Sequence, residues 1–379
     1  MFQEKLLSEL IGINSVFPSE QEVALYLENQ LQRRGFQVER QYLTPDRFNL
    51  VAQFGQGERT VMYYAHMDVV PEYQGWTRQP FALSADEERY YGRGVADMKG
   101  GIAAFLSAFD AVKLPNHRVI LVLGVDEENI SAGGHLFAAQ TDIEPDVVFS
   151  LEGDALSCRW THPIILTWGR RGRAAYRLRV PGISAHGATL SEGMNAISEA
   201  ARLVLALDEM TLPTHTHLPA ASQYIRTIAA DAGSLSIPDS VELMLDRHLV
   251  PPETSASVLN ELRQFINGLY RDGTLCTELA ERFEIDLMPR ETAYLEPFVT
   301  SQESAIAQQI VQLVSDRHRD IPAHYGSSVA DENVFAHRFS CPVLCVGPVG
   351  GNYHGADEWV SKESLEAITE TYADFLRNL

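Results

Sequence analysis

A histidine and two acidic residues stand out as side chains capable of chemistry. The apolar run VMYYAHMDVV indicates a buried strand that ends at His66, and Asp68 lies two residues further on. Residues two apart in an extended chain point to the same side. Asp97 follows in GRGVADMKGG, directly before a helix-like segment. An imidazole among carboxylates suits a divalent metal; a solvent-facing histidine near helix-capping acids is the alternative.

Ligand-type residues also follow three further apolar runs. RVILVLGV leads to Glu127 and Glu128, DVVFSL leads to Glu152 and Asp154, and CPVLCV leads through a glycine-rich turn to His354. Ligands of open α/β sheets bind at the carboxyl ends of strands, so residues far apart in sequence can converge there. A solvated surface rarely produces several such coincidences. We therefore predict a metal site at one edge of a sheet.

The elements that position these residues follow an α/β pattern. Continuous apolar strands separated by helices predict a mostly parallel sheet covered on both faces. We expect strands over 48–54, 61–66, 118–125, 146–151 and 342–346, and helices over 19–35, 97–112, 302–314 and 361–377. The first of these helices shows capping-box spacing from Ser19 to Glu22.

A second domain is expected in the middle of the chain. From Arg173 the sequence alternates like a strand with one solvated face, and strand and helix patterns then follow in the order β-α-β-β-α-β. We expect strands from 173 and over 223–229, 241–249 and 283–288, with helices over 195–210 and 254–269. This predicts a catalytic domain of residues 1–172 and 291–379 and an inserted, smaller α+β domain of residues 173–290, ferredoxin-like in its element order.

Composition narrows the class of protein. The chain has 379 residues, which favours two domains, and its net charge of −21 argues against nucleic acid and anionic membranes as partners. No apolar run approaches the ~20 residues of a membrane span, and the amino terminus lacks the pattern of a signal peptide. The four cysteines form no CxxC motif or disulfide framework, and we interpret Cys341 and Cys345 as small buried hydrophobes in a strand. A cytoplasmic protein is expected.

Five motifs together resemble the M20 metallopeptidases, a family that includes acetylornithine deacetylases, succinyl-diaminopimelate desuccinylases, dipeptidases and carboxypeptidases. The motifs are HMDVVP, GRGVADMKGG, GVDEE, LEGD and YHGADEWV, in this order and spacing. The resemblance covers nearly the whole chain, including the inserted domain. It implies a zinc-hydrolase type of catalytic domain and an inserted domain that serves as a lid and in dimerisation.

The resemblance also implies a site with two divalent metal ions, usually zinc, with cobalt or manganese as alternatives. The implied ligands are His66 and Glu152 for one metal, Glu128 and His354 for the other, and Asp97 as the bridge. A cis peptide bond to Met98 would follow the bridging residue. Many relatives have Glu-Pro where this chain has Glu152-Gly153, so Asp154 stays open as an alternative ligand.

Two acidic residues have implied roles beside the metals. Glu127 matches the general base, which would take a proton from the metal-bridged water and return it to the leaving amine. Asp68 matches the carboxylate that orients His66, because a ligating histidine needs its other N–H held.

Three residues have implied roles in substrate binding. His186 matches a histidine that reaches the active site of the partner subunit, which implies a homodimer built through residues 173–290; a surface turn is the alternative. Arg247 matches an arginine that holds the substrate carboxylate, with a salt bridge on a strand as the alternative. Ser327 lies in a pocket-lining loop of the family.

The expected activity is that of a dinuclear-metal hydrolase. The substrate would be a small molecule, an N-acyl amino acid cleaved at its amide bond as by a deacetylase, or a short peptide. A dipeptidase or carboxypeptidase of the same family and a catalytically silent amino-acid-binding member are the alternatives.

Overall fold

The computed structural model describes residues 2–154, 160–233 and 235–379, and the chain forms two units. The first unit joins Met1–Arg170 to Val299–Leu379, and the second unit is Arg171–Phe298. The second unit is therefore an insertion into the chain of the first.

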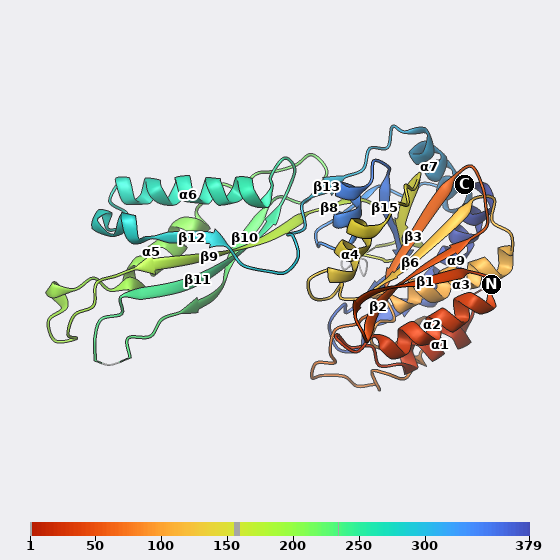
Figure 1. Ribbon diagram of the computed structural model, residues 1–379, viewed down its shortest axis with the longest axis horizontal. Helices are drawn as coiled ribbons and strands as arrows, with labels where there is room; N and C mark the ends of the chain where they lie inside the picture. Colours follow the sequence, from red (N-terminus) through yellow and green to blue (C-terminus); the bar gives the residue numbers. More distant parts are fainter. Residues whose placement is uncertain (1, 155–159, 234) are drawn as a thin grey trace. The chain divides into compact units, whose positions relative to one another are not determined.

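The first unit is built on a nine-stranded sheet in the order β1-β2-β6-β3-β7-β15-β8-β13, with β14 paired to β8 (Figure 1). Its strands are β1 Gln37–Thr44, β2 Arg47–Phe54, β3 Thr60–His66, β6 Arg118–Gly124, β7 Val147–Ser150, β8 Ile164–Arg170, β13 Phe298–Val299, β14 His324–Gly326 and β15 Val343–Pro348. The four central strands β6, β3, β7 and β15 are parallel. Strand β2 pairs antiparallel with β1 and β6, and β8 pairs antiparallel with β15 but parallel with β14. The predicted α/β class is confirmed, and the parallel part forms the middle of a mixed sheet.

Helices cover both faces of this sheet. Figure 1 shows α1, α2, α3 and α9 gathered on one side and α4 on the other, where α4 packs on α8. The helices of this unit are α1 Glu4–Gly12, α2 Gln21–Arg33, α3 Lys99–Val112, α4 Ala132–Gln140, α7 Ala305–His318, α8 Glu332–Arg338 and α9 Lys362–Asn378. Small residues at the start of α3 let its first three turns, residues 99–109, lie buried between the sheet and α9.

Two local expectations differ from the structure. No side chain caps α2, which follows Glu20, so the capping box predicted from Ser19 is wrong. The Glu20 carboxylate is instead buried, 2.6 Å from Nη2 of Arg47. Cys341 precedes β15 and is half-buried, whereas Cys345 lies within β15 and is buried as expected; Cys158 lies outside the described residues.

A small second sheet brings together two segments that are distant in sequence. Its order is β16-β17-β5-β4, with β4 Ser84–Ala85, β5 Arg89–Tyr91, β16 Gly350–Gly351 and β17 Trp359–Ser361. The antiparallel pairing of β17 with β5 fixes the segment after His354 beside the segment before Asp97.

The second unit has the predicted order of elements. Its four strands form an antiparallel sheet in the order β10-β11-β9-β12, and its two long helices share one hydrophobic core with that sheet. The elements are β9 Gly172–Pro181, η2 Leu190–Glu192, α5 Ala196–Asp208, β10 Ser222–Ala229, β11 Ser240–Leu249, α6 Ser255–Arg271, η3 Thr277–Arg282 and β12 Glu284–Leu287. Among the described residues of the whole chain, no helix is both long and apolar enough to cross a membrane.

Candidate metal centre

Three neighbouring parallel strands end at the same edge of the large sheet. His66 is the last residue of β3 and pairs with Gly124, the last residue of β6, so Glu127 and Glu128 follow just beyond. On the other side of β3, β7 ends at Ser150, two residues before Glu152. The parallel register therefore brings these acidic residues to the histidine, as expected for the carboxyl ends of strands.

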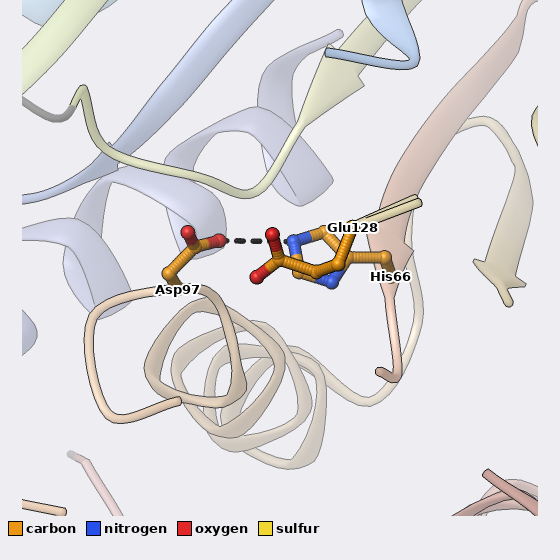
Figure 2. Close-up of side chains that lie close together, drawn as sticks. All are labelled: His66, Asp97 and Glu128. Atoms are coloured by element: carbon orange, nitrogen blue, oxygen red, sulfur yellow. Dashed lines mark hydrogen bonds and ion pairs between the residues drawn. The ribbon is translucent and has the colours of Figure 1, made fainter. Parts of the chain in front are cut away.

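Asp97 lies between the two histidines. Its Oδ1 is 2.9 Å from Nε2 of His66, and its Oδ2 is 3.3 Å from Nε2 of His354. Nε2 of His354 is also 3.0 Å from Oε2 of Glu128. Figure 2 shows the side chains of His66, Asp97 and Glu128 pointing toward one another, and one donor atom from each lies within 4.8 Å of the other two. One carboxylate thus presents a separate oxygen to each imidazole.

The charge state of Asp97 follows from these neighbours. Burial alone would raise the pKa of this carboxyl, but hydrogen bonds from His354 and His66 hold the pKa well below its usual range. Asp97 is therefore an ionised carboxylate at the turn before α3. The peptide bond from Asp97 to Met98 is cis, as the family resemblance implies.

Asp68 links His66 to the segment that carries the two glutamates. Its backbone carbonyl lies 2.9 Å from Nδ1 of His66, whereas its carboxylate Oδ1 lies 3.8 Å from the same nitrogen. The carboxylate accepts hydrogen bonds from the backbone N–H groups of Glu127, at 3.3 Å, and Glu128, at 3.0 Å. Asp68 therefore contacts the imidazole mainly through its backbone and fixes the Glu127–Glu128 turn with its side chain.

Glu127 lies beside the histidine without a close contact to it. Its Oε2 is 4.0 Å from Nε2 of His66, and its side chain is 13% exposed. Burial raises the pKa of Glu127 well above its usual value; His66 lowers the pKa, and nearby Glu128 raises it further. Its neighbour Glu128 turns toward His354 instead. The two adjacent glutamates thus face different partners.

Glu152 follows β7 at the same edge of the sheet and forms a salt bridge with Arg170. Burial raises the pKa of Glu152, and both Asp97 and His66 are close enough to influence that pKa. Nη2 of Arg170 lies 3.4 Å from Oε2 of Glu152. Asp154 instead lies 3.9 Å from Nη1 of Arg170 and 3.4 Å from Nε2 of His324. Asp154 thus contacts Arg170 and His324, whereas Glu152 is within reach of the charges of Asp97 and His66. The choice of Glu152 over Asp154 as a ligand stays a prediction.

A second cluster of possible donor atoms is already filled by a cation. Glu152, Glu332 and Cys345 have donor atoms within 4.8 Å of one another. Nη2 of Arg170 lies 3.5 Å from Oε1 of Glu332 and 3.3 Å from Sγ of Cys345, in addition to its contact with Glu152. The buried guanidinium thus takes the place that a metal ion would need, and this cluster is a salt bridge.

Of the three residues expected to bind substrate, His186 and Arg247 belong to the second unit and Ser327 belongs to the first. His186 is exposed in the second unit, and its Nδ1 accepts a hydrogen bond from the N–H of Ala188 at 3.1 Å, which leaves the proton of the neutral imidazole on Nε2. Ser327 follows β14 in the first unit, and its neighbour Ser328 accepts a 2.6 Å hydrogen bond from Arg170.

Arg247 is completely buried in the second unit. Its guanidinium pairs with the carboxylate of Glu253, lies 3.3 Å from Glu261, and donates to Oε1 of Gln223 at 2.8 Å. These contacts correspond to the salt-bridge alternative. A role for Arg247 toward a substrate carboxylate stays a prediction.

The donor set of the first unit fits divalent cations. Two imidazole nitrogens and carboxylate oxygens are the ligands that zinc and similar borderline metals prefer. The oxygens of Asp97 face both histidines, so that one carboxylate can contribute to two neighbouring ions. His66, Asp97, Glu128 and His354 are the residues that could hold them, with Glu152 adjacent.

Comparisons with known proteins agree with this fold. The model of peptidase family M20/M25/M40 matches residues 62–378. The chain is 30% identical over 390 residues to a succinyl-diaminopimelate desuccinylase of Methylorubrum extorquens, which covers 98% of this chain and 97% of that protein. It is 29% identical over 363 residues to an acetylornithine deacetylase of Edwardsiella ictaluri, covering 92% and 88%. A tripeptidase structure from Staphylococcus aureus superposes with a TM-score of 0.76 at 18% identity, covering 100% of this chain and 98% of that one.

These findings define a metal-dependent hydrolase with an α/β catalytic domain. The chain belongs to peptidase family M20/M25/M40, and the resemblance predicted from its motifs is confirmed. Membership of this family implies divalent metal ions.

Three residues around the centre escaped the sequence reasoning. Arg170 is the last residue of β8, a strand that is not among those predicted from the sequence. Arg93 and Glu358 stand inside the motifs GRGVADMKGG and YHGADEWV, but charged residues in a motif carry no sign of their partners. The sequence feature that could have pointed to them is their spacing: Arg93 lies four residues before Asp97, and Glu358 lies four residues after His354.

Proposed function

We propose that this chain is a dinuclear-metal hydrolase that cleaves the amide bond of an N-acyl amino acid. The observation that carries the proposal is the position of Asp97, which presents Oδ1 to His66 at 2.9 Å and Oδ2 to His354 at 3.3 Å. A carboxylate shared in this way is the arrangement needed to bridge two ions. Zinc is the metal we expect, with cobalt and manganese as alternatives.

The proposed ligands form two sets joined by Asp97. His66 and Glu152 would hold one ion, and Glu128 and His354 would hold the other. When bound, the two ions supply Lewis acidity toward the attacking water and the scissile carbonyl. The carbonyl of Asp68 keeps Nδ1 of His66 occupied at 2.9 Å, which leaves Nε2 directed at Asp97.

Glu127 is the proposed general base. It lies beside His66 and turns away from the contacts that Glu128 makes, so it is available to take a proton from water and return it to the leaving amine. Asp68 fixes the backbone of both glutamates, and this separates their roles. The geometry of Glu127, rather than its titration, supports the assignment.

The names of the relatives favour an acyl amino acid as substrate. The two relatives described above are a deacetylase and a desuccinylase, and both cover most of the chain. The tripeptidase structure supports a small peptide as the alternative. Both substrates present an amide carbonyl to the same site.

A homodimer built through residues 173–290 is part of the proposal. Strand β10 is the edge of the second sheet and exposes Tyr224 and Ile228, and α5 exposes Ile197 and Leu205. An unpaired strand edge beside apolar side chains supports pairing with a second copy. His186 of one subunit, with its proton on Nε2, would then donate to the substrate carbonyl of the other.

A hydrolysis panel tests the proposed activity. Metal-free protein is loaded with zinc or cobalt and assayed on N-acetyl amino acids, N-succinyl amino acids and dipeptides, with metal content measured. Glu127→Gln should lower kcat by about 10²–10⁴-fold while two ions remain bound. Glu303→Gln, at an exposed position, is the matched control and should leave both unchanged. Two bound ions without turnover of any substrate would instead favour a silent amino-acid-binding protein, and fewer than two ions would overturn the mechanism.

A further inference from the structure

A buried carboxylate stands behind the candidate metal centre. Glu358 is 1% exposed and lies four residues after His354. Its Oε1 accepts hydrogen bonds from the backbone N–H groups of Ala96, at 2.9 Å, and Asp97, at 3.1 Å, and its Oε2 accepts from Gly94 at 2.9 Å. A single side chain from the carboxyl-terminal part of the chain therefore holds the backbone of the turn that presents Asp97.

Arg93 pairs with Glu358 and contacts the loop that presents His354. Its Nη1 lies 2.7 Å from Oε2 of Glu358, and both side chains are 1% exposed. Its Nη2 donates to the backbone carbonyls of His354, at 3.3 Å, and Gly355, at 3.0 Å. Arg93 precedes Asp97 in the chain, yet it holds the loop that presents His354.

Each of the two residues thus holds the ligand that lies close to the other residue in sequence. Glu358 comes from the loop of His354 and binds the turn of Asp97, while Arg93 comes from the turn of Asp97 and binds the loop of His354. The ion pair between them joins both halves. The ligand atoms that depend on this connection, Oδ2 of Asp97 and Nε2 of His354, are 3.3 Å apart.

The loop of His354 needs such support because its backbone is unusual. His354 has φ of 60°, and Asn352 and Asp357 have φ of 57° and 51°. These values lie in the left-handed region, which residues with a Cβ adopt far less often than glycine, although Asn, Asp and His enter it more readily than other residues. The hydrogen bonds from Arg93 to the carbonyls of His354 and Gly355 hold the loop in this conformation.

We propose that the Arg93–Glu358 ion pair is a positioning element that couples Asp97 to His354 and thereby sets the geometry of the two-ion site. The proposal rests on the proposed function, because it concerns the ligands assigned there. Neither side chain is assigned as a ligand or as a group that touches substrate. Their effect passes through the backbone of the two ligands.

The two members of the pair should have different effects on the two ions. Glu358 holds the turn of Asp97, which contributes to both ions, so Glu358→Gln should weaken both. Glutamine keeps one acceptor oxygen and turns an NH2 group toward N–H donors that previously met a carboxylate. Arg93→Lys keeps a charge for Glu358, but a single ammonium cannot also reach both carbonyls. It should weaken only the ion that His354 and Glu128 hold.

Isothermal titration calorimetry of metal-free protein with Zn²⁺ measures the affinity of each site and tests this proposal. Loss of an outer contact of this kind costs about 10–100-fold in metal affinity, and we expect at least about tenfold at both sites in Glu358→Gln and at one site in Arg93→Lys. Thermal unfolding of each metal-free variant is recorded first. If Glu358→Gln does not fold, the two Zn²⁺ affinities of Arg93→Lys still test the proposal.

A second ion pair in the same unit provides the control. Arg34 and Asp110 form two parallel contacts, Nε–Oδ1 at 2.8 Å and Nη2–Oδ2 at 2.7 Å. Arg34→Lys and Asp110→Asn should therefore lower stability and leave both Zn²⁺ affinities unchanged.

The outcomes separate this proposal from the proposed function. Wild-type affinity at both sites in Arg93→Lys or Glu358→Gln would overturn it, as would an equal loss in the control variants. Wild-type protein that binds fewer than two ions would defeat the proposed function itself, and the coupling with it. A loss confined to one site in Arg93→Lys would support the coupling, since general destabilisation does not select one ion.

Discussion

The close approach of α3 to the end of β7 leads to a prediction at Gly101. A methyl group placed on this residue would lie 1.8 Å from the backbone oxygen of Leu151, whereas real Cβ atoms essentially never come closer than 3.0 Å to such an atom. Gly101→Ala must therefore separate the two segments by at least about 1.2 Å, the difference between these distances. Leu151 directly precedes Glu152, and Gly101 lies in the first turn of α3, four residues after Asp97.

This displacement is large compared with what a metal site tolerates. Metal–ligand distances vary by only about 0.2 Å, so a shift of this size on the Glu152 side should lower the affinity for the ion held there by about tenfold or more. Overpacking of a buried contact costs about 1–3 kcal/mol, and the gain in helix propensity offsets at most about 1 kcal/mol of it. We expect a net loss of about 1–2 kcal/mol in the free energy of unfolding.

Chemical denaturation and Zn²⁺ titration of the Gly101→Ala variant check both parts. Gly12→Ala is the matched control, since Gly12 lies in α1 of the same unit and has no atom within 4 Å of an added methyl group. The control should change the free energy of unfolding by less than about 1 kcal/mol and leave metal affinity unchanged. Wild-type stability and affinity in Gly101→Ala would refute the claim that this contact positions Glu152.

Three further predictions concern acidic pH, the glutamate turn and the dimer. Burial lowers the pKa of His117 to about 4 in the folded protein. Between that value and the usual pKa of histidine, the side chain is protonated in the unfolded chain but not in the folded protein. This residue should therefore remove about 2 kcal/mol of stability between about pH 7.5 and about pH 5. Chemical denaturation at both pH values should show a smaller loss in His117→Gln, and equal losses would contradict the assignment. Asp68→Asn should lower metal affinity and kcat by about 10–100-fold, because an amide offers one acceptor to two backbone donors; an unchanged Zn²⁺ titration would count against it. Ile228→Lys, on the exposed edge strand, should shift the protein to monomers in light scattering and lower activity, whereas an intact dimer would exclude this edge as the interface.

The sequence was most informative where strand ends carry ligand-type residues. Parallel register alone brings His66, Glu128 and Glu152 to one edge, and runs of consecutive apolar residues are visible in a single sequence. The order of elements in the inserted unit was equally predictable, because its amphipathic strands and helices have clear periods. These parts of the fold depend on local patterns.

Other parts depend on partners that a sequence does not name. Strand β1 carries mostly exposed residues and shows little apolar periodicity, so it was not predicted. Ser19 has the right spacing for a cap, but the neighbouring Glu20 found a buried partner in Arg47. The contacts of Arg93, Arg170 and Glu358 likewise join residues far apart in the chain. Such pairings depend on tertiary structure and could not be derived from local periods.

The insertion of the second unit has a consequence for synthesis of the chain. Strand β7 ends at Ser150, but its parallel neighbour β15 begins only at Val343, and His354 and Glu358 follow it. At about 5–20 residues per second, a ribosome needs roughly 10–40 s to travel that distance. During this interval the nascent sheet presents an unpaired edge at β7, and Asp97 has neither its second histidine nor the carboxylate that holds its turn. The metal centre can therefore be completed only after the inserted unit, His354 and Glu358 have all been made.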